Sequence, residues 1–376
     1  MFNRKGPSRL TQVAAAAAAA LLGLSACSGA EGSSAEGTTT ITVANAALEG
    51  TPHAVVYEAY LDLIEDRTDG RIEFDRTSFE ALCGMAEVAQ CVSDGRADFG
   101  VSVPDYTPNV FPTSTLAGVP FLSPDIQATS AALHEMHTTN DQAMAMMEKN
   151  NLHYAATWPV GTLFIGSKEP VENIDDLKGL SMRASGPATQ AVLEDAGVNM
   201  NAITAGETYE GLQRGVIDSV ASALDFATGY KINEQVGYWT DPGLGQYSTY
   251  AMWWNASTFD ALPEDLQTVI DEASAEFNNG LLTETYNEAV ADVCQGMMDA
   301  TTVENFDRWD DAASEEWRAS AGDLGKSVWL KQAADSGLED PEGYLEAYQA
   351  SYESHVSEDN PIDAAVTCVD QWQAQK

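Results

Sequence analysis

The chain has few basic residues. Its 376 residues include 18 Lys and Arg against 58 Asp and Glu, which gives a formal net charge of −40 at pH 7. Such a charge repels nucleic acid and anionic membrane surfaces, so the shortage argues against both as partners. With 44% hydrophobic residues, eight Trp and thirteen Tyr, the acidic chain is still able to fold. Its length allows two domains with separate cores.

No stretch approaches the ~20 consecutive apolar residues that a membrane-spanning helix needs. A short apolar run, Val13–Leu24, follows a basic segment and precedes Leu24-Ser25-Ala26-Cys27. This order is typical of an export signal, and its last four residues resemble a bacterial lipobox, in which the cysteine is lipidated. We predict a lipoprotein signal peptide over 1–26 and a flexible Gly- and Ser-rich tether over 27–39. An ordinary secretory signal with an incidental cysteine remains the alternative.

Cysteine is scarce as well. Apart from Cys27 there are four: Cys83, Cys91, Cys294 and Cys368. No two of them have Cys-x-x-Cys spacing, which argues against a zinc site. In an exported protein four cysteines indicate disulfides, for which three pairings exist. We favour Cys83–Cys91 and Cys294–Cys368, with free thiols as the alternative.

The familiar catalytic and nucleotide-binding motifs are missing. The sequence has no Gly-x-Ser-x-Gly, no Walker A, no dinucleotide loop and no EF-hand loop. His134 and His137 share one face of a predicted helix but lack the His-Glu-x-x-His spacing of a zinc helix, and we interpret them as a solvated face. We therefore expect no enzyme activity, no catalytic residues, no metal and no cofactor.

Strands and helices alternate along the rest of the chain. Apolar or alternating runs predict strands over 40–44, 71–75, 97–103 and 152–158. Amphipathic runs predict helices over 51–67, 84–94 and 126–150. This order predicts an α/β fold whose sheets are mostly parallel and flanked by helices.

Two segments about a domain apart resemble each other. Glu87–Val101 and Glu207–Ala221 each contain a helix that ends at a glycine, an aspartate three residues later, and a strand of small residues. Glycine suits the end of a helix, and aspartate suits a tight turn where it binds local backbone. We interpret Asp98 and Asp218 as structural residues. The repeat predicts two similar α/β domains.

The segment 173–190 contains the main candidate binding residue. A helical turn, Asp175–Lys178, stops at Gly179, a short strand over 180–184 includes Arg183, and a new helix follows. A guanidinium beside a helix N-terminus combines a planar fork of donors with unpaired N–H groups. Because the whole chain repels anions, an anionic ligand needs a local positive site of this kind. We predict that Arg183 binds a carboxylate.

Six segments together resemble the solute-binding subunit of TRAP transporters (tripartite ATP-independent periplasmic transporters), of the DctP type. They are Thr68-Asp-Gly-Arg-Ile72, Asp94-Gly-Arg-Ala-Asp98, Gly118-Val-Pro-Phe-Leu122, Asn173–Arg183, Glu207–Asp218 and Phe259–Gln267. The resemblance implies a two-lobed, periplasmic-binding-protein-like α/β fold with mixed sheets. It also implies strands exchanged between the lobes, a long bracing helix, and closure about a hinge when a ligand binds.

The resemblance further implies an organisation and a role. Residues 40–160 plus about 249–290 are expected to form lobe I, and 161–248 plus about 291–376 lobe II. The expected partners are a small organic carboxylate and TRAP transporter membrane subunits. The expected location is the outer face of the bacterial cell membrane, periplasmic or cell-surface. There a monomer would touch the membrane only through the lipid on Cys27.

The family pattern also assigns individual residues. Arg183 occupies the position that pairs with the ligand carboxylate, and Asn45 that of a ligand-contacting asparagine. Elsewhere the chain departs from the sialic-acid branch of the family. Its second arginine, an acidic residue, an asparagine and an aromatic residue are replaced near Leu163, Val103, Ser222-Ala223 and Ala205-Gly206 respectively. These departures favour a small or partly apolar monocarboxylate held by one arginine.

Other candidate ligand contacts lie near predicted strand ends or helix starts. They are His53, Tyr106, Trp158, Ser222, Asp225 and Phe226. Each has an ordinary structural alternative: Trp158 suits a core or hinge position, Asp225 a helix cap, and His53 the first turn of a helix. We expect at least half of the later aromatic residues Tyr247, Tyr250, Trp253 and Trp254 to lie in the core.

Three other functions are compatible with the sequence. The chain could serve an ABC importer, and neighbouring genes for TRAP membrane subunits rather than an ATPase would decide. It could be a secreted α/β enzyme, against which the missing catalytic motifs argue. It could also be a ligand-sensing partner of a receptor.

Overall fold

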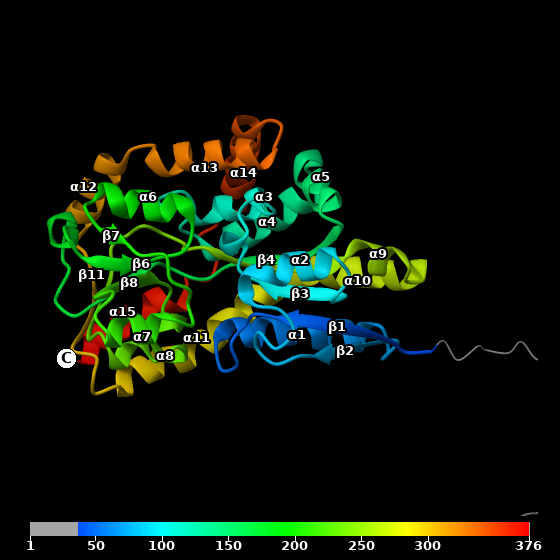
Figure 1. Cartoon of the computed structure of the whole chain (residues 1–376), viewed down its shortest axis with the longest axis horizontal. Coiled ribbons are helices and arrows are strands. Elements are labelled where there is room, and N and C mark those ends of the chain that lie inside the picture. The colour runs from blue at the N-terminus through cyan, green and yellow to red at the C-terminus, as the bar shows by residue number, and fades with distance from the viewer. Residues whose placement is uncertain (1–36, 376) are drawn as a thin grey trace, which may run out of the picture. The chain divides into compact units, whose positions relative to one another are not determined.

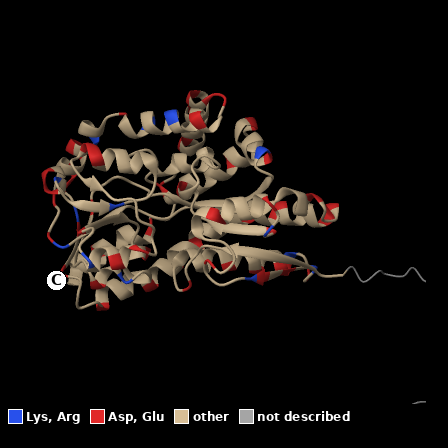
Figure 2. Ribbon diagram, in the orientation of Figure 1, with Lys and Arg blue, Asp and Glu red and all other residues tan. Residues whose placement is uncertain are grey.

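A computed structural model describes residues 37–375. The predicted signal peptide, Cys27 and most of the predicted tether lie outside the described residues. Among helices of the described part, none is both long and apolar enough to cross a membrane. Figure 2 shows Asp and Glu spread over helices and loops, with far fewer Lys and Arg between them.

The first sheet has the strand order β2-β1-β3-β10-β4 (Figure 1). Its strands are β1 (Thr39–Asn45), β2 (Ile72–Arg76), β3 (Phe99–Ser102), β4 (Leu152–Pro159) and β10 (Thr249–Asn255). Strand β1 pairs in parallel with β2 and β3, whereas β10 is antiparallel to β3 and β4. The sheet is therefore mixed, and its late strand β10 lies between two early ones.

The second sheet has the order β11-β9-β5-β8-β6-β7. Its strands are β5 (Phe164–Ser167), β6 (Ser181–Arg183), β7 (Asn199–Met200), β8 (Ser219–Ser222), β9 (Tyr238–Asp241) and β11 (Asn305–Arg308). Strand β6 is parallel to β7 and β8, and β5 is antiparallel to β8 and β9. This sheet is mixed as well.

Helices flank both sheets. They are α1 (Pro52–Arg67), α2 (Val88–Ser93), α3 (Pro112–Thr115), α4 (Ile126–Thr139), α5 (Asp141–Lys149), α6 (Pro187–Asp195), α7 (Thr208–Gln213), α8 (Asp225–Gly229), α9 (Ala256–Asp260), α10 (Glu264–Glu276), α11 (Leu282–Asp299), α12 (Asp311–Ala321), α13 (Leu324–Ser336), α14 (Pro341–His355) and α15 (Ala364–Gln375). The single helix predicted over 126–150 is wrong. Asn140 is extended there, and its side-chain oxygen accepts the N–H groups of Gln142 and Ala143, which starts a new helix.

The chain passes between the sheets three times near the middle of the fold. Residues 160–163 join β4 to β5, and residues 242–248 join β9 to β10. These two linkers lie side by side, because Thr162 and Gln246 form an antiparallel bridge. The third connection is a helical segment of 36 residues, Glu264–Asp299, in which α10 packs on α1 and α11 packs on α15. The predicted two-lobed α/β fold, with exchanged strands and a long bracing helix, is confirmed.

The C-terminal helices contact elements from both predicted lobes. Helix α13 packs on α6, while α14 packs on α4. A second hydrophobic core forms there, separate from the main one, and it includes Trp329 and Tyr344. The lobe boundaries predicted from the sequence, with residues 291–376 assigned to lobe II, remain a prediction.

The internal repeat has one structural cause in both copies. The carboxylate of Asp98 accepts the backbone N–H of Thr42 in the neighbouring strand β1, at 2.9 Å. The carboxylate of Asp218 accepts the N–H of Ser181 at the start of β6, also at 2.9 Å. Each aspartate thus ties its own strand to the adjacent parallel strand. The structural interpretation of both is confirmed, although the partner is the next strand rather than the local turn.

Two disulfides are present, Cys83–Cys91 and Cys294–Cys368, which is the pairing favoured from the sequence. The first links residues 8 apart and the second links residues 74 apart, joining α11 to α15. A longer closed loop restricts the unfolded chain more, so the second disulfide should stabilise the fold more.

Removing the Cys294–Cys368 disulfide should therefore cost more than removing the Cys83–Cys91 disulfide. The loop-closure model gives about 4 kcal/mol for the Cys294→Ala/Cys368→Ala variant and about 3 kcal/mol for the Cys83→Ala/Cys91→Ala control. Denaturant unfolding of both double variants measures the two losses of unfolding free energy. A larger loss in the Cys83/Cys91 variant would contradict the prediction.

Candidate functional site

Arg183 is buried without an acidic partner. It is the last residue of β6 and is 3% exposed. Its Nη2 donates a hydrogen bond of 3.0 Å to the Tyr106 hydroxyl, and its guanidinium lies 4.8 Å from the centroid of the Phe226 ring. Its Nε makes no hydrogen bond, and no Asp or Glu of the described chain forms an ion pair with it. A buried charge without a counter-charge is costly, which indicates an anion site.

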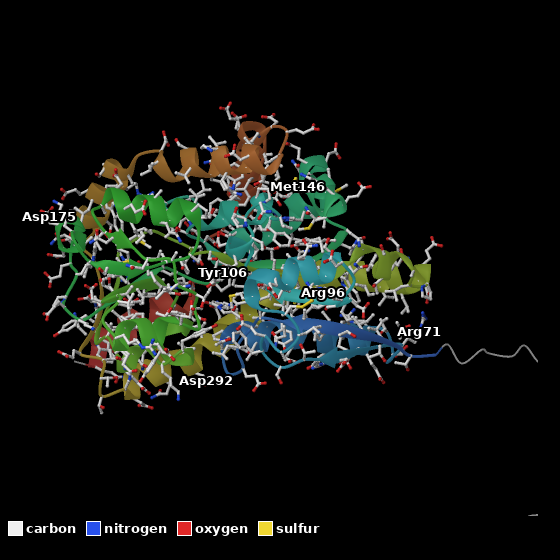
Figure 3. All side chains as sticks on the ribbon, in the orientation of Figure 1. Arg71, Arg96, Tyr106, Met146, Asp175 and Asp292 are labelled. Carbon is white, nitrogen blue, oxygen red and sulfur yellow. A yellow bond between two sulfur atoms is a disulfide. The ribbon has the colours of Figure 1, made fainter. Side chains whose placement is uncertain are left out.

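A small cavity surrounds the Arg183 side chain. Residues on or following strands of both sheets line it: Met85, Val103, Tyr106, Val160, Arg183, Ser185, Ala205, Ser222, Asp225, Phe226, Tyr230, Tyr247, Ser248 and Tyr250. Its free space is about 30 Å³, room for roughly two water molecules. Figure 3 labels Tyr106 in the middle of the fold, between the elements of the two sheets. A space of this size is too small for an organic acid unless lining residues move.

Tyrosine hydroxyls supply the donors around Arg183. Burial raises the pKa values of Tyr230, Tyr247 and Tyr250 above the ordinary range, so all three phenols stay protonated at neutral pH. The Tyr106 oxygen already accepts hydrogen bonds from Arg183 and from the N–H of Ala205 at 3.3 Å. Its own proton is therefore available for a third partner. Neutral donors of this kind suit a carboxylate.

The positive charge of Arg183 persists despite its burial. Burial by itself lowers the pKa of Arg183, but the neighbouring Tyr247, Tyr106 and Tyr230 raise it, and the balance lies above the ordinary value. A guanidinium is in any case not deprotonated in proteins. The cavity thus contains a permanent cation in a chain of net charge −40.

A second polar group lies beside the cavity. The indole N–H of Trp158 donates to Nδ1 of His53 at 3.1 Å, and the His53 ring stacks on Tyr250 with centroids 4.3 Å apart. Nε2 of His53 lies 3.4 Å from Oδ2 of Asp225. His53 and Trp158 are both fully buried. They do not line the cavity themselves but lie behind Tyr250 and Asp225, which do.

The structure brings together five of the eight predicted ligand contacts. Tyr106, Arg183, Ser222, Asp225 and Phe226 all line the cavity, whereas Asn45, His53 and Trp158 do not. The Asn45 amide is occupied by other protein groups: it donates to the Tyr57 hydroxyl and accepts the N–H of Ala47. The ligand-binding role of every member of this set remains a prediction.

Several lining residues escaped sequence reasoning. Tyr230 lies four residues after Phe226, one helical turn further on, and this spacing could have predicted that both side chains face the cavity. Ser185 and Ser248 bear no distinctive pattern. The sequence predicts that the N-terminus of α6 lies beside Arg183 in the anion site. Instead, Gly186 and Pro187 line a separate small cavity together with Asp105.

A larger hollow of about 750 Å³ lies elsewhere, beside α4, α5 and β4. His134, His137 and His153 are among its lining residues. The solvated-face interpretation is wrong for His137: α4 packs on β4, His137 stacks on Tyr154, and burial lowers its pKa to about 4. Within residues 37–375 no cluster of three or more potential metal ligands occurs. Nothing in this hollow matches the buried cation of the smaller cavity.

Comparison with known proteins decides the family. The model for bacterial extracellular solute-binding proteins of family 7, called DctP, matches residues 43–331. The chain belongs to this family of TRAP transporter solute-binding proteins. Members of the family are extracytoplasmic binding proteins rather than enzymes.

Curated relatives in the family bind different solutes. The C4-dicarboxylate-binding periplasmic protein DctP of Rhodobacter capsulatus is 27% identical over 273 residues, which cover 68% of this chain and 76% of that protein. The ectoine-binding periplasmic protein TeaA of Halomonas elongata is 23% identical over 234 residues, covering 61% of this chain and 68% of that one.

Solved structures of TRAP solute-binding proteins have the same fold. One from Rhodoferax ferrireducens, with copurified benzoate, superposes with a TM-score of 0.75 at 22% identity, covering 85% of this chain and 98% of that one. One from a marine metagenome, with 3-hydroxybenzoate, gives a TM-score of 0.76 at 20% identity, covering 85% and 100%.

Asp105 links the Arg183 cavity to the second cavity at the start of α6. It follows β3 and is partly buried, and its carboxylate accepts a hydrogen bond from the Ser248 hydroxyl. A side chain at Gly186 would meet this carboxylate, because an added Cβ would lie 3.1 Å from its Oδ1. Burial raises the pKa of Asp105 to about 6, although the bond from Ser248 works in the opposite direction.

The raised pKa of Asp105 predicts a cost in folding stability that depends on pH. Between about pH 4 and 6 the native state holds a proton that the unfolded chain has lost, so ionisation of Asp105 lowers stability as pH rises. Asp105→Asn should remove that cost and raise the free energy of unfolding at pH 7 by at most about 3 kcal/mol, with little change at pH 4.

Denaturant unfolding of wild type and Asp105→Asn at both pH values measures this difference. The matched control is Asp323→Asn, because Asp323 is 83% exposed. Equal effects of Asp105→Asn at pH 4 and pH 7 would refute the assignment.

Proposed function

We propose that this chain is a lipid-anchored receptor that captures a small organic carboxylate in the cavity around Arg183. Closure of the two lobes would enclose the ligand, and the closed receptor would deliver it to TRAP transporter membrane subunits. The proposal rests mainly on one observation, the buried guanidinium of Arg183 without an acidic partner. The family assignment and the acid ligands of structural relatives support it.

The geometry suggests how a carboxylate would be held. The guanidinium offers a planar set of donors that matches the two oxygens of a carboxylate. The Tyr106 hydroxyl has a proton to donate, since its oxygen already accepts from Arg183 and Ala205. Phe226 covers one face of the guanidinium and keeps water from it. The ligand charge would then replace the missing counter-charge.

Ligand binding and closure are coupled in this proposal. Tyr106 follows a strand of the first sheet, and Arg183 ends a strand of the second. An anion held by both would favour the closed state over an open one, because only closure brings the two residues together. The predicted lobe boundaries and the monomeric state belong to this proposal.

The lining favours a ligand with an apolar part. Val103, Val160 and Met85 line the cavity together with aromatic rings, and Arg183 is the only Lys or Arg among its described lining residues. A small monocarboxylate therefore fits better than a ligand that needs two arginines.

The competing functions lose support from the family match. An ABC importer receptor and a secreted enzyme both lie outside the matched family. A ligand-sensing role is compatible with the same binding site, and genes for TRAP membrane subunits beside this one would favour transport.

Removing the guanidinium should abolish tight binding. A thermal-shift screen with benzoate, mandelate, orotate, pyroglutamate and C4-dicarboxylates first identifies a ligand, because binding to the native state raises the melting temperature. Arg183→Ala should then weaken the calorimetric affinity for it by ~2–5 kcal/mol, the usual loss when one partner of a buried charge pair is removed.

Arg214→Ala is the matched control. Arg214 is 71% exposed and pairs with Glu210 on the surface, so its loss should leave ligand affinity unchanged. If Arg183→Ala binds as tightly as this control, Arg183 is not the carboxylate anchor.

The proposed lipid anchor on Cys27 makes a separate prediction. In cells that process lipoproteins, mass spectrometry of the N-terminal peptide should find a chain that begins at Cys27 with a diacylglyceryl group. Cys27→Ser should remove the lipid and release the protein from the membrane fraction. A mature wild-type chain that begins elsewhere without lipid would rule the anchor out.

A further inference from the structure

The cavity around Arg183 also contains an acidic side chain, Asp225. It is 6% exposed and is the first residue of α8. Its Oδ1 is buried and has no hydrogen-bond partner in residues 37–375. It does not cap α8 either, because the capping position is Leu224 and no side chain there bonds to the helix. The helix-cap alternative therefore does not explain Asp225.

The histidine beside Asp225 leaves one carboxylate oxygen without a partner. The indole N–H of Trp158 can only donate, so Nδ1 of His53, which it contacts at 3.1 Å, must be the acceptor. With Nδ1 as the acceptor, the N–H group of the ring is at Nε2 and faces Asp225. Its Nε2 lies 3.4 Å from Oδ2 of Asp225 and makes no hydrogen bond. Oδ2 of Asp225 thus has only this long contact, and Oδ1 has no partner.

Arg183 does not neutralise Asp225. Both side chains line the same cavity, but no ion pair joins them in the described chain. Burial raises the pKa of Tyr230, Asp225 raises it further, and Arg183 lowers it, so both charges act on the same hydroxyl. The cavity therefore has a positive side and a negative side, each with an unpaired buried group.

A plain carboxylate would satisfy only one of these sides. It would pair with Arg183 and leave Oδ1 of Asp225 as a buried polar atom without a partner, which is costly. A ligand with a carboxylate and a protonated nitrogen would satisfy both sides and bring no net charge into the cavity. We infer that the ligand is zwitterionic, with its carboxylate on Arg183 and its N–H donors on Asp225.

This inference rests on the proposed function, because it takes Arg183 as the carboxylate anchor. It adds a ligand class and a specificity-determining residue. His53 and Trp158 become positioning residues: the hydrogen bond from Trp158 orients the His53 ring so that its Nε2 faces Oδ2 of Asp225, and Oδ1 is left for the ligand. The apolar lining then holds the part of the ligand between its two charges.

Matched pairs of probes test the inference. Phenylglycine and phenylacetate differ only by an ammonium group, and proline and cyclopentanecarboxylate differ only by the ring nitrogen. Calorimetry on the mature wild-type chain should show at least one zwitterion binding about 30-fold or more tightly than the matched carboxylate that lacks the nitrogen. In Asp225→Asn this preference should fall to a few-fold or reverse. The wild-type comparison needs no variant to fold.

The outcomes separate the inference from the proposed function. If plain carboxylates bind wild type as tightly as their zwitterionic partners, and Arg183→Ala abolishes that binding, the zwitterion inference fails and the carboxylate receptor stands. If a zwitterion is preferred but Asp225→Asn, folded by its melting transition, keeps the full preference, the role of Asp225 is refuted. If neither member of either pair binds, but the thermal-shift screen finds a plain carboxylate whose binding Arg183→Ala abolishes, the zwitterion inference fails and the carboxylate receptor stands.

Discussion

The arrangement of this receptor depends on one buried guanidinium. Arg183 is surrounded by tyrosines and a phenylalanine, and no Asp or Glu of the described chain forms an ion pair with it. Burying such a charge costs several kcal/mol unless a counter-charge compensates it. In a chain with 58 acidic residues the absence of an ion pair at this described side chain is a specific feature. An external anion would supply the missing counter-charge.

The segments that connect the two sheets also help to form the cavity. The crossing linkers and the helix Glu264–Asp299 connect the two sheets, and the linkers themselves supply Val160, Tyr247 and Ser248 to the cavity. Any movement between the sheets would therefore alter the cavity lining. Arg183 ends a strand of the second sheet, and Asp225 starts the helix that follows another of its strands. Tyr106 comes from the first sheet, because it follows β3.

The sequence predicts those features of the fold and site that depend on local pattern. Strand and helix alternation, the glycine–aspartate repeat and the position of Arg183 at a strand end are all short-range features. The break at Asn140 was missed because a single capping side chain outweighed a continuous amphipathic pattern. The arrangement of His53, Trp158 and Asp225 was inaccessible, because it joins residues 105 and more positions apart through packing alone. Burial of His137 escaped for the same reason.

A crystal structure of the mature chain with a bound ligand found by screening tests the central claim most directly. The account predicts both carboxylate oxygens within hydrogen-bond distance, about 2.7–3.2 Å, of the Arg183 guanidinium or the Tyr106 hydroxyl. A ligand whose carboxylate lies elsewhere, for example in the hollow lined by His134 and His153, with Arg183 still unpaired, would contradict it.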